Sequence, residues 1–239
     1  LQTNGGGRPL GFHPHEPSGD VYVCDSRRGL VVVEGTDGRR VRDVATAIAP
    51  RSRARAGERI TYANDLDLLS ARDAAAGVAA AAGAGGKAAK KAKAKDKGNA
   101  KEEEPVVFFT SCTDIDPPYN AKGGFYDTMR GYQLDLAQGA PRGALLAWSP
   151  SLGGAVVVAE GFYYANGVAL SRGGDYALVV ETNRNRVLRV WLDGRPGGGN
   201  ATAAAAAAGA GGAAAPPPPP PSRGAGKTGP GGPGAPHPA

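Results

Sequence analysis

The sequence is poor in residues that cross-link small domains or bind metal ions: two cysteines, three histidines and one methionine among 239 residues. Cys24 and Cys112 are too few for a disulfide framework and lack the spacing of a zinc site. They could form one bridge or remain two buried thiols, and the sequence leaves both alternatives open. No run approaches the roughly 20 apolar residues of a membrane-spanning helix, so we expect no membrane span. The chain begins with Leu1, and the residues after it do not read as a signal peptide.

Two low-complexity tracts differ sharply from the rest of the chain. Residues 74–104 consist largely of Ala, Gly and Lys and end in a run of Glu, and residues 195–239 are mainly Gly, Ala and Pro. Neither tract has the apolar periodicity that would bury enough side chain to offset the entropy lost on ordering. We therefore predict that both are disordered, the first as an insertion and the second as a tail.

The basic charge is concentrated in the first of these tracts. Residues 87–104 hold seven lysines and four acidic residues, a net +3, which is half of the +6 of the whole chain. A lysine-rich tract can attract nucleic acid or an acidic membrane surface. It lacks aromatic residues for base stacking, so we interpret it as a solvated insertion and expect no nucleic-acid partner.

Outside the tracts, the sequence predicts an all-β fold. Short runs of β-branched and aromatic residues end in turn residues, which is typical of strands. The predicted strands are Asp20–Ser26, Gly29–Gly35, Pro105–Ser111, Gly143–Ser149, Gly154–Gly161, Tyr176–Thr182 and Arg186–Gly194. Helical periodicity is scarce, and we expect at most a turn or two in Arg42–Ala49 and Tyr126–Ala137.

These strands recur as three repeats that begin near Arg8, Tyr62 and Tyr164. Each repeat has an apolar strand, a polar turn, a strongly apolar strand and a further strand. In the first and third repeats the strongly apolar strand ends in an acid, Asp25 or Glu181, which we interpret as an acceptor of backbone or arginine hydrogen bonds. Repeats of about 40–45 residues built from short strands predict a β-propeller, here with about three to four blades. Such an open arrangement would expose an edge strand and be prone to aggregation.

The motif Tyr-Ala-Asn occurs twice, in "YANDL" at Tyr62 and in "YANGV" at Tyr164. Asn before Asp or Gly is a common turn pair, because Asn tolerates a left-handed backbone and bonds its own main chain. From the residues alone, a turn is the favoured interpretation of both copies.

The order of motifs resembles the strictosidine synthase-like family. "GRPLGF", "GDVYVCDSRRGLVVV", "YANDLDL", "VVFFTS", "GFYYANGVALS" and "YALVVETNRNRVLRVWLDG" carry the resemblance. That family includes the adipocyte plasma membrane-associated protein and is related to the paraoxonases and to gluconolactonase/regucalcin. The resemblance covers residues 7–73 and 105–194, and it implies a six-bladed propeller that is incomplete within residues 7–194.

The resemblance also implies a metal site. In metal-dependent relatives, asparagines of Asn-Asp and Asn-Gly motifs hold a divalent cation, usually calcium, and Asn64 and Asn166 match those positions. An amide oxygen suits Ca²⁺, which takes about six to eight oxygen ligands. Asp65 is a candidate for a second cation, with a hydrogen bond at the start of the strand as the competing interpretation. The acids that complete the family's cation site lie in blades that this chain does not show.

By resemblance, we expect a calcium-dependent hydrolase that acts on a small-molecule ester or lactone. The catalytic glutamate of strictosidine synthases has no counterpart here, so strictosidine synthase activity is not expected, and no general base is identified. The alternatives are a non-catalytic propeller for binding or scaffolding and a truncated, inactive fragment. Asn200 begins a glycosylation sequon, which fits the secretory pathway: the endoplasmic reticulum, a vacuole or the cell exterior.

Overall fold

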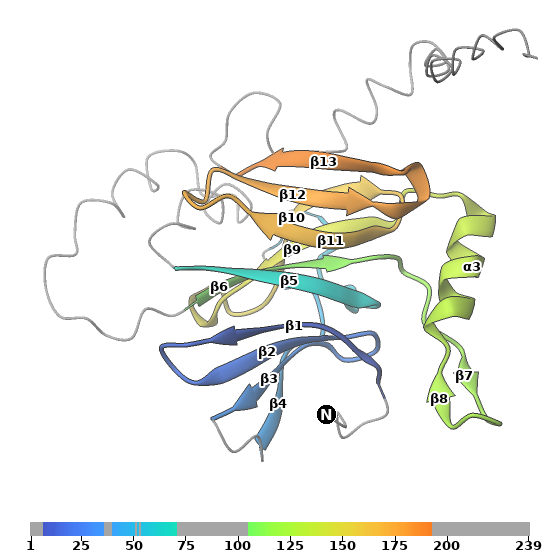
Figure 1. Cartoon of the computed structure of the whole chain (residues 1–239), viewed down its shortest axis with the longest axis horizontal. Coiled ribbons are helices and arrows are strands. Elements are labelled where there is room, and N and C mark those ends of the chain that lie inside the picture. The colour runs from blue at the N-terminus through green and yellow to red at the C-terminus, as the bar shows by residue number, and fades with distance from the viewer. Residues whose placement is uncertain (1–6, 36–39, 51, 53, 71–104, 193–239) are drawn as a thin grey trace, which may run out of the picture.

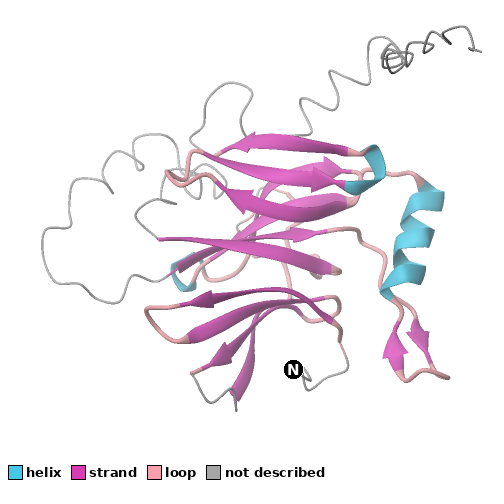
Figure 2. Cartoon of the chain, viewed as in Figure 1, coloured by secondary structure: helices cyan, strands magenta, loops and turns pink. Residues whose placement is uncertain are grey.

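A computed structural model describes residues 7–35, 40–50, 52, 54–70 and 105–192 of the chain (Figures 1 and 2). These residues form mostly β structure, with three antiparallel sheets of three or four strands and a small hairpin. The tracts 74–104 and 195–239, predicted to be disordered, lie outside the described residues, and so does the sequon at Asn200.

The first sheet is an antiparallel meander in which each strand pairs with the next along the chain. Its strands are β1 (Pro9–His15), β2 (Asp20–Asp25), β3 (Gly29–Glu34) and β4 (Arg40–Ala45). The turn between β1 and β2 contains Gly19 with φ 72°, a left-handed backbone that glycine adopts without steric cost. Gly174, with φ 69°, holds the corresponding turn of the third sheet.

The second and third sheets repeat this meander. The second contains β5 (Ala63–Ser70), β6 (Pro105–Ser111), β9 (Gly143–Trp148) and β10 (Val156–Phe162), in that order. The third contains β11 (Ala165–Leu170), β12 (Tyr176–Glu181) and β13 (Arg186–Trp191). Every residue of β6 and of β9 is buried, as expected for strands covered on both faces of their sheet.

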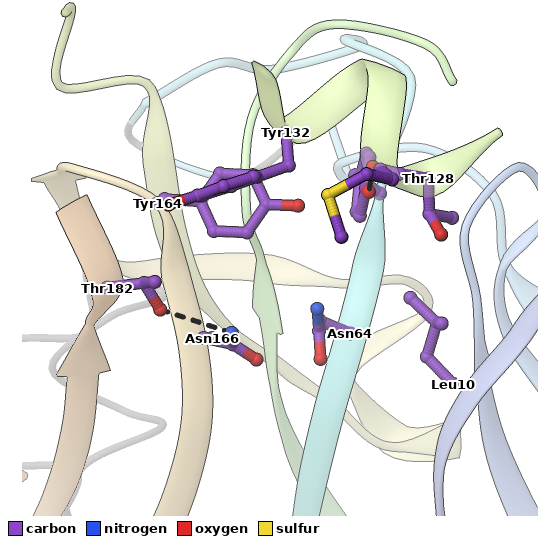
Figure 3. A pocket seen from close by; sticks show the side chains of 9 residues that line it. Leu10, Asn64, Thr128, Tyr132, Tyr164, Asn166 and Thr182 are labelled. Atoms are coloured by element: carbon purple, nitrogen blue, oxygen red, sulfur yellow. Dashed lines mark hydrogen bonds between the residues drawn. The ribbon is translucent and has the colours of Figure 1, made fainter. Parts of the chain in front are cut away.

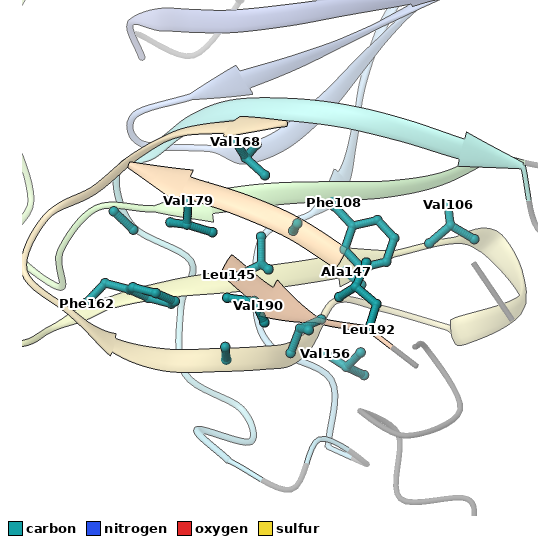
Figure 4. Packing of buried hydrophobic residues seen from close by; sticks show 14 of the residues in the cluster. Val106, Phe108, Leu145, Ala147, Val156, Phe162, Val168, Val179, Val190 and Leu192 are labelled. Atoms are coloured by element: carbon teal, nitrogen blue, oxygen red, sulfur yellow. The ribbon is translucent and has the colours of Figure 1, made fainter. Parts of the chain in front are cut away.

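The second sheet lies between the other two and shares an apolar core with each. One cluster joins Tyr22 and Leu30 of the first sheet to Phe109 of the second. The other cluster joins Phe108 of the second sheet to Val179 of the third (Figure 4). The first strands of the sheets, β1, β5 and β11, are neighbours along one side of the stack (Figure 1). Burial of apolar side chains between successive sheets therefore sets how the three first strands face one another.

One helix stands outside the sheets. The segment between β6 and β9 contains the hairpin β7 (Tyr119–Asn120) and β8 (Phe125–Tyr126), followed by α3 (Thr128–Gln138). The Asp127 side chain caps the helix by accepting a hydrogen bond from Arg130 N at 2.9 Å, and Gly139 ends it in a left-handed conformation. In Figure 1, α3 stands beside the ends of the sheets.

Six of the seven predicted strands are confirmed within a residue or two, while the predicted strand Arg186–Gly194 corresponds to β13, which ends at Trp191, and its predicted end lies outside the described residues. Two expectations, at Arg42–Ala49 and Tyr126–Ala137, need correction. Residues 40–45 form β4 rather than a helical turn, because pairing with β3 overrides a weak local preference. The second stretch holds an 11-residue helix, longer than the expected turn or two, since it is capped at both ends.

Cys24 and Cys112 are both free and buried, so the structure shows two buried thiols rather than the disulfide bridge that the sequence left open. In the part of the chain that the structure describes, no helix is long and apolar enough to cross a membrane.

A prediction follows from the close approach of β1 and β5. A Cβ atom at Gly11 would lie 2.6 Å from the Asn64 carbonyl oxygen and 2.7 Å from Asp65 Oδ1. Gly11→Ala is therefore expected to lower the free energy of unfolding in urea by about 1–3 kcal/mol, as overpacking does. Gly173→Ala is the control, because its nearest neighbour would be 3.7 Å away, at Asp175. Equal stability of the two variants would contradict the tight contact between the strands.

Candidate functional site

The two Tyr-Ala-Asn motifs form the same irregular start of a strand. The register of β5 on β6 shifts at Asn64-Asp65, and the register of β11 on β12 shifts at Asn166-Gly167. Such β-bulges turn a side chain away from the direction that regular alternation would give it. The asparagine of each motif is therefore re-aimed by the same backbone irregularity.

The tyrosine that precedes each asparagine fixes this conformation. Tyr62 and Tyr164 have φ values of 50° and 63°, left-handed conformations that are uncommon for bulky residues. The carbonyl oxygen of Tyr62 accepts a hydrogen bond from Cys112 N, and that of Tyr164 accepts one from Thr182 N, both at 3.1 Å. Cys112 and Thr182 thus hold equivalent positions, each just after the second strand of its sheet.

The same two residues anchor the asparagine side chains. Asn64 Nδ2 donates to Cys112 Sγ and Asn166 Nδ2 donates to Thr182 Oγ1, both at 3.1 Å. Figure 3 shows the second of these hydrogen bonds. Among the described residues, none donates a hydrogen bond to Oδ1 of Asn64 or of Asn166. Each amide therefore has its nitrogen end fixed by the protein and its oxygen end available to a ligand.

Leu10 holds the corresponding position in the first sheet. The register of β1 on β2 shifts between Pro9 and Phe12, and the Arg8 carbonyl oxygen accepts a hydrogen bond from Ser26 N at 2.9 Å, as the tyrosine carbonyls do in the other sheets. The first repeat therefore contributes an apolar side chain where the others contribute amides. This correspondence was missed in the sequence, because "PLGF" has neither the tyrosine nor the asparagine of the motif.

These three positions line one cavity of about 280 Å³. Its lining consists of Leu10, Tyr62, Asn64, Thr128, Met129, Tyr132, Tyr164, Asn166 and Thr182. Three of these residues come from the first turns of α3, so the helix forms a wall of the cavity. No Asp, Glu or His is among the lining residues that the structure describes, which leaves the cavity without an evident general base.

Tyrosine rings hold α3 against the sheets. The ring centroids of Tyr164 and Tyr62 are 5.6 Å apart, and those of Tyr164 and Tyr132 are 5.0 Å apart, both in edge-to-face arrangements. The Tyr62 hydroxyl also donates to the Thr128 carbonyl oxygen at the start of the helix. Burial raises the pKa of Tyr62 and of Tyr164, so both hydroxyls stay protonated near neutral pH and cannot serve as bases there.

The structure gives Asp65 a role between sheets. Asp65 Oδ2 accepts a hydrogen bond from Val168 N at 3.0 Å, and Asp67 Oδ2 accepts one from Leu170 N at 2.8 Å. The two carboxylates therefore bridge β5 to β11. The bond from Val168 N agrees with the interpretation of Asp65 as a hydrogen-bond acceptor near the start of its strand. A role of Asp65 toward a second cation stays a prediction. Within the described ranges, no three His, Cys, Asp or Glu side chains gather to hold a metal ion.

The acids that end β2 and β12 are structural, as predicted. Both are fully buried. Asp25 Oδ1 accepts hydrogen bonds from Arg27 N and Arg28 N at 2.9 and 3.0 Å. Glu181 accepts one from Tyr163 N at 2.7 Å and forms an ion pair with Arg186. Neither acid lines the cavity.

Asp135 connects the far end of α3 to the third sheet. It is 1% exposed, and its Oδ2 accepts a hydrogen bond from Asn183 Nδ2 at 2.9 Å. Asn183 follows Thr182, the residue that anchors Asn166. Burial raises the pKa of Asp135, and the nearby charge of Arg142 opposes this effect only in part. The helix is thus bonded near its start to Tyr62 of the first Tyr-Ala-Asn motif. Near its end it is bonded to Asn183, which follows Thr182, the residue that anchors Asn166.

The raised pKa of Asp135 predicts a pH dependence of stability. The folded state binds a proton on Asp135 more tightly than the unfolded chain does, so stability falls as pH rises from the ordinary carboxyl pKa through the raised one. In Asp135→Asn this loss disappears, while the amide oxygen can still accept from Asn183. The melting temperature of the variant minus that of the wild type should therefore be more positive at about pH 7 than at about pH 4.

The exposed Asp116, which pairs with Arg59, provides the control. The Asp116→Asn variant, scanned by calorimetry under the same conditions, corrects for general effects of removing one negative charge. A difference between Asp135→Asn and wild type that is the same at both pH values would contradict the assignment.

Sequence comparisons point to one family. The family profile described as strictosidine synthase matches residues 100–195. The protein STRICTOSIDINE SYNTHASE-LIKE 13 of Arabidopsis thaliana is 27% identical over 188 residues, which is 79% of this chain and 34% of that protein. STRICTOSIDINE SYNTHASE-LIKE 10 of the same plant is 27% identical over 192 residues, 80% of this chain and 38% of that protein. The chain therefore spans about a third of the length of these curated relatives.

Two further similarities are more distant or more local. Lactonase drp35 of Staphylococcus saprophyticus is 40% identical over 82 residues, 34% of this chain and 24% of the lactonase. The solved structure of regucalcin, a calcium-binding protein of Agrobacterium tumefaciens, superposes with a TM-score of 0.34 at 12% identity, covering 80% of this chain and 56% of regucalcin. The matched motifs and the curated relatives agree that the chain is similar to the strictosidine synthase-like family.

Proposed function

We propose that the three sheets are blades of a six-bladed β-propeller type and that the cavity beside their first strands is the site of a calcium-dependent ester or lactone hydrolase. Two features support the propeller arrangement. Each sheet is an antiparallel meander, and the first strands β1, β5 and β11 are neighbours, as strands around a central channel are.

The observation that carries the proposed function is the pair of anchored amides. The nitrogen ends of Asn64 and Asn166 are held by Cys112 and Thr182, so their oxygen ends remain available beside one cavity. Neutral, hard oxygens of this kind fit Ca²⁺, which takes about six to eight oxygen ligands. The two amides would supply part of that set, with water, substrate and further protein oxygens as the remainder. When bound, such a cation polarises a carbonyl group and stabilises negative charge on its oxygen.

The other lining residues suit an apolar substrate. Leu10 and Met129, with the rings of Tyr62, Tyr132 and Tyr164, give the cavity a largely apolar wall that would hold the hydrocarbon part of an ester or lactone and exclude water from it. The local similarity to lactonase drp35 supports this substrate class.

The absence of an acid or a histidine from the described lining favours a second candidate, a propeller that binds a small molecule without converting it. Asn200 and its sequon, outside the described residues, support a location in the secretory pathway as part of the proposal.

Calcium binding tests the proposal. Calcium is expected to raise the melting temperature of the full chain, because a ligand that binds only the folded state stabilises it. The double variant Asn64→Ala and Asn166→Ala should lose that shift, since both amide oxygens are gone. Asn120→Ala should keep it, because the Asn120 side chain only caps a surface turn through Lys122 N and Gly123 N.

Hydrolysis of an aryl ester and of a lactone, assayed with and without calcium, separates the two candidates. Calcium-dependent turnover that is lost in the double variant supports the hydrolase. A calcium shift without turnover of either substrate supports the binding module. No calcium shift in the wild-type chain, or the same shift in the double variant, would contradict the proposed site.

A further inference from the structure

Arg8 holds the place in the first sheet that Tyr62 and Tyr164 hold in the other two. Its carbonyl oxygen accepts a hydrogen bond from Ser26 N at 2.9 Å, as each tyrosine carbonyl does from the residue after the second strand of its sheet. The N–H of Arg8 also donates to Ser26 Oγ at 3.2 Å. Both tyrosines line the cavity. The side chain of Arg8 therefore starts from a fixed backbone, at a position whose counterparts face the cavity.

The guanidinium of Arg8 reaches the wall of the cavity. Arg8 Nη1 donates to Thr128 Oγ1 at 3.0 Å, and Thr128 is a lining residue from the first turn of α3. The Tyr62 hydroxyl bonds the carbonyl oxygen of the same threonine, so Arg8 and Tyr62 converge on the start of the helix from two sheets. Burial raises the pKa of Tyr62, and the positive charge of Arg8 opposes this effect, which agrees with their closeness.

The same guanidinium keeps donors for a ligand. A guanidinium has five N–H donors, and Thr128 accepts from one of them. Among the described residues, no acidic side chain forms an ion pair with Arg8, which is exposed. Asp127, the acid next to Thr128 in the chain, accepts the hydrogen bond from Arg130 N that caps the helix. Arg8 thus brings a positive charge to the edge of a cavity whose described lining is uncharged.

We propose that Arg8 is a specificity-determining residue of this cavity and binds a carboxylate group of its ligand. A planar guanidinium forms paired hydrogen bonds with a carboxylate, which a neutral amide of the same size cannot match. Figure 3 shows Thr128 at the opposite side of the cavity from Asn166. A ligand would therefore place its carboxylate at the Arg8 end and its ester or lactone carbonyl toward the two amides. The substrate class is an ester or lactone that carries a carboxylate, an inference that rests on the function proposed above.

Binding of two matched probes tests the inference without any turnover. Hexanoate carries a carboxylate, and hexanamide has the same chain length and no charge. Calorimetric titration of the wild-type chain without calcium should show hexanoate bound about three- to fivefold more tightly than hexanamide, the effect of one partly exposed ion pair. Added salt should reduce this preference, because salt screens exposed charges.

Variants of Arg8 locate the preference. Arg8→Gln should bind the two probes equally, because glutamine keeps a donor for Thr128 but has no charge. Arg8→Lys should keep part of the preference, since lysine keeps the charge without the planar pair of donors. Arg172→Gln is the control. Arg172 is exposed in the turn between β11 and β12, at the end of β11 away from Asn166, and its variant should prefer hexanoate as the wild type does.

Equal binding of the two probes by the wild-type chain, binding of neither probe, or an unchanged preference in Arg8→Gln would overturn the inference. Unchanged circular dichroism shows that each variant is folded. The double variant Asn64→Ala and Asn166→Ala should keep the preference, because the probes are measured without calcium. Loss of the calcium shift with the preference intact therefore refutes the proposed metal site alone. Absence of the preference with the calcium shift intact refutes the role of Arg8 alone.

Discussion

The hydrogen bond from the residue that follows the second strand of each sheet to the carbonyl oxygen just before its first strand is the interaction on which the candidate site depends. In the second and third sheets that carbonyl belongs to Tyr62 or Tyr164, each held in a left-handed conformation. The bond sets the bulge that follows, and the bulge turns Asn64 or Asn166 out of the regular alternation of its strand. A backbone constraint, repeated at equivalent positions, thus determines where the two candidate ligand amides lie. The strain of two left-handed tyrosines is consistent with a site that the surrounding packing holds in place.

The same constraint links the site to the helix. The ring of Tyr62 contacts the ring of Tyr164, and its hydroxyl reaches the start of α3, while Asp135 ties the end of α3 to Asn183. Movement of the helix would therefore disturb the neighbours of both amides. The cavity combines fixed polar groups on strands with an apolar wall from a helix, an arrangement suited to orienting a small molecule without enclosing it in charge.

Much of the fold and half of the site follow from the sequence. Repeated short strands and the two Tyr-Ala-Asn motifs predict the three meanders and the equivalence of Asn64 and Asn166, because strand patterns and turn chemistry are local. The sequence does not predict Leu10, since the feature that the three sheets share at its position is a backbone bulge rather than a residue type. The wall formed by Met129 and Tyr132 was also missed, because α3 has a weak apolar periodicity and its placement depends on tertiary contacts with distant tyrosines.

Terbium luminescence tests most directly whether the two amide oxygens share a cation. Tb³⁺ replaces Ca²⁺ at oxygen sites and emits when a nearby tyrosine is excited, and the rings of Tyr62 and Tyr164 line the same cavity as both amides. Titration of the chain with Tb³⁺ should give saturable emission that calcium suppresses and that the double variant Asn64→Ala and Asn166→Ala lacks. Emission that is absent from the wild-type chain, or unchanged in the double variant, would contradict a cation held between the two asparagines.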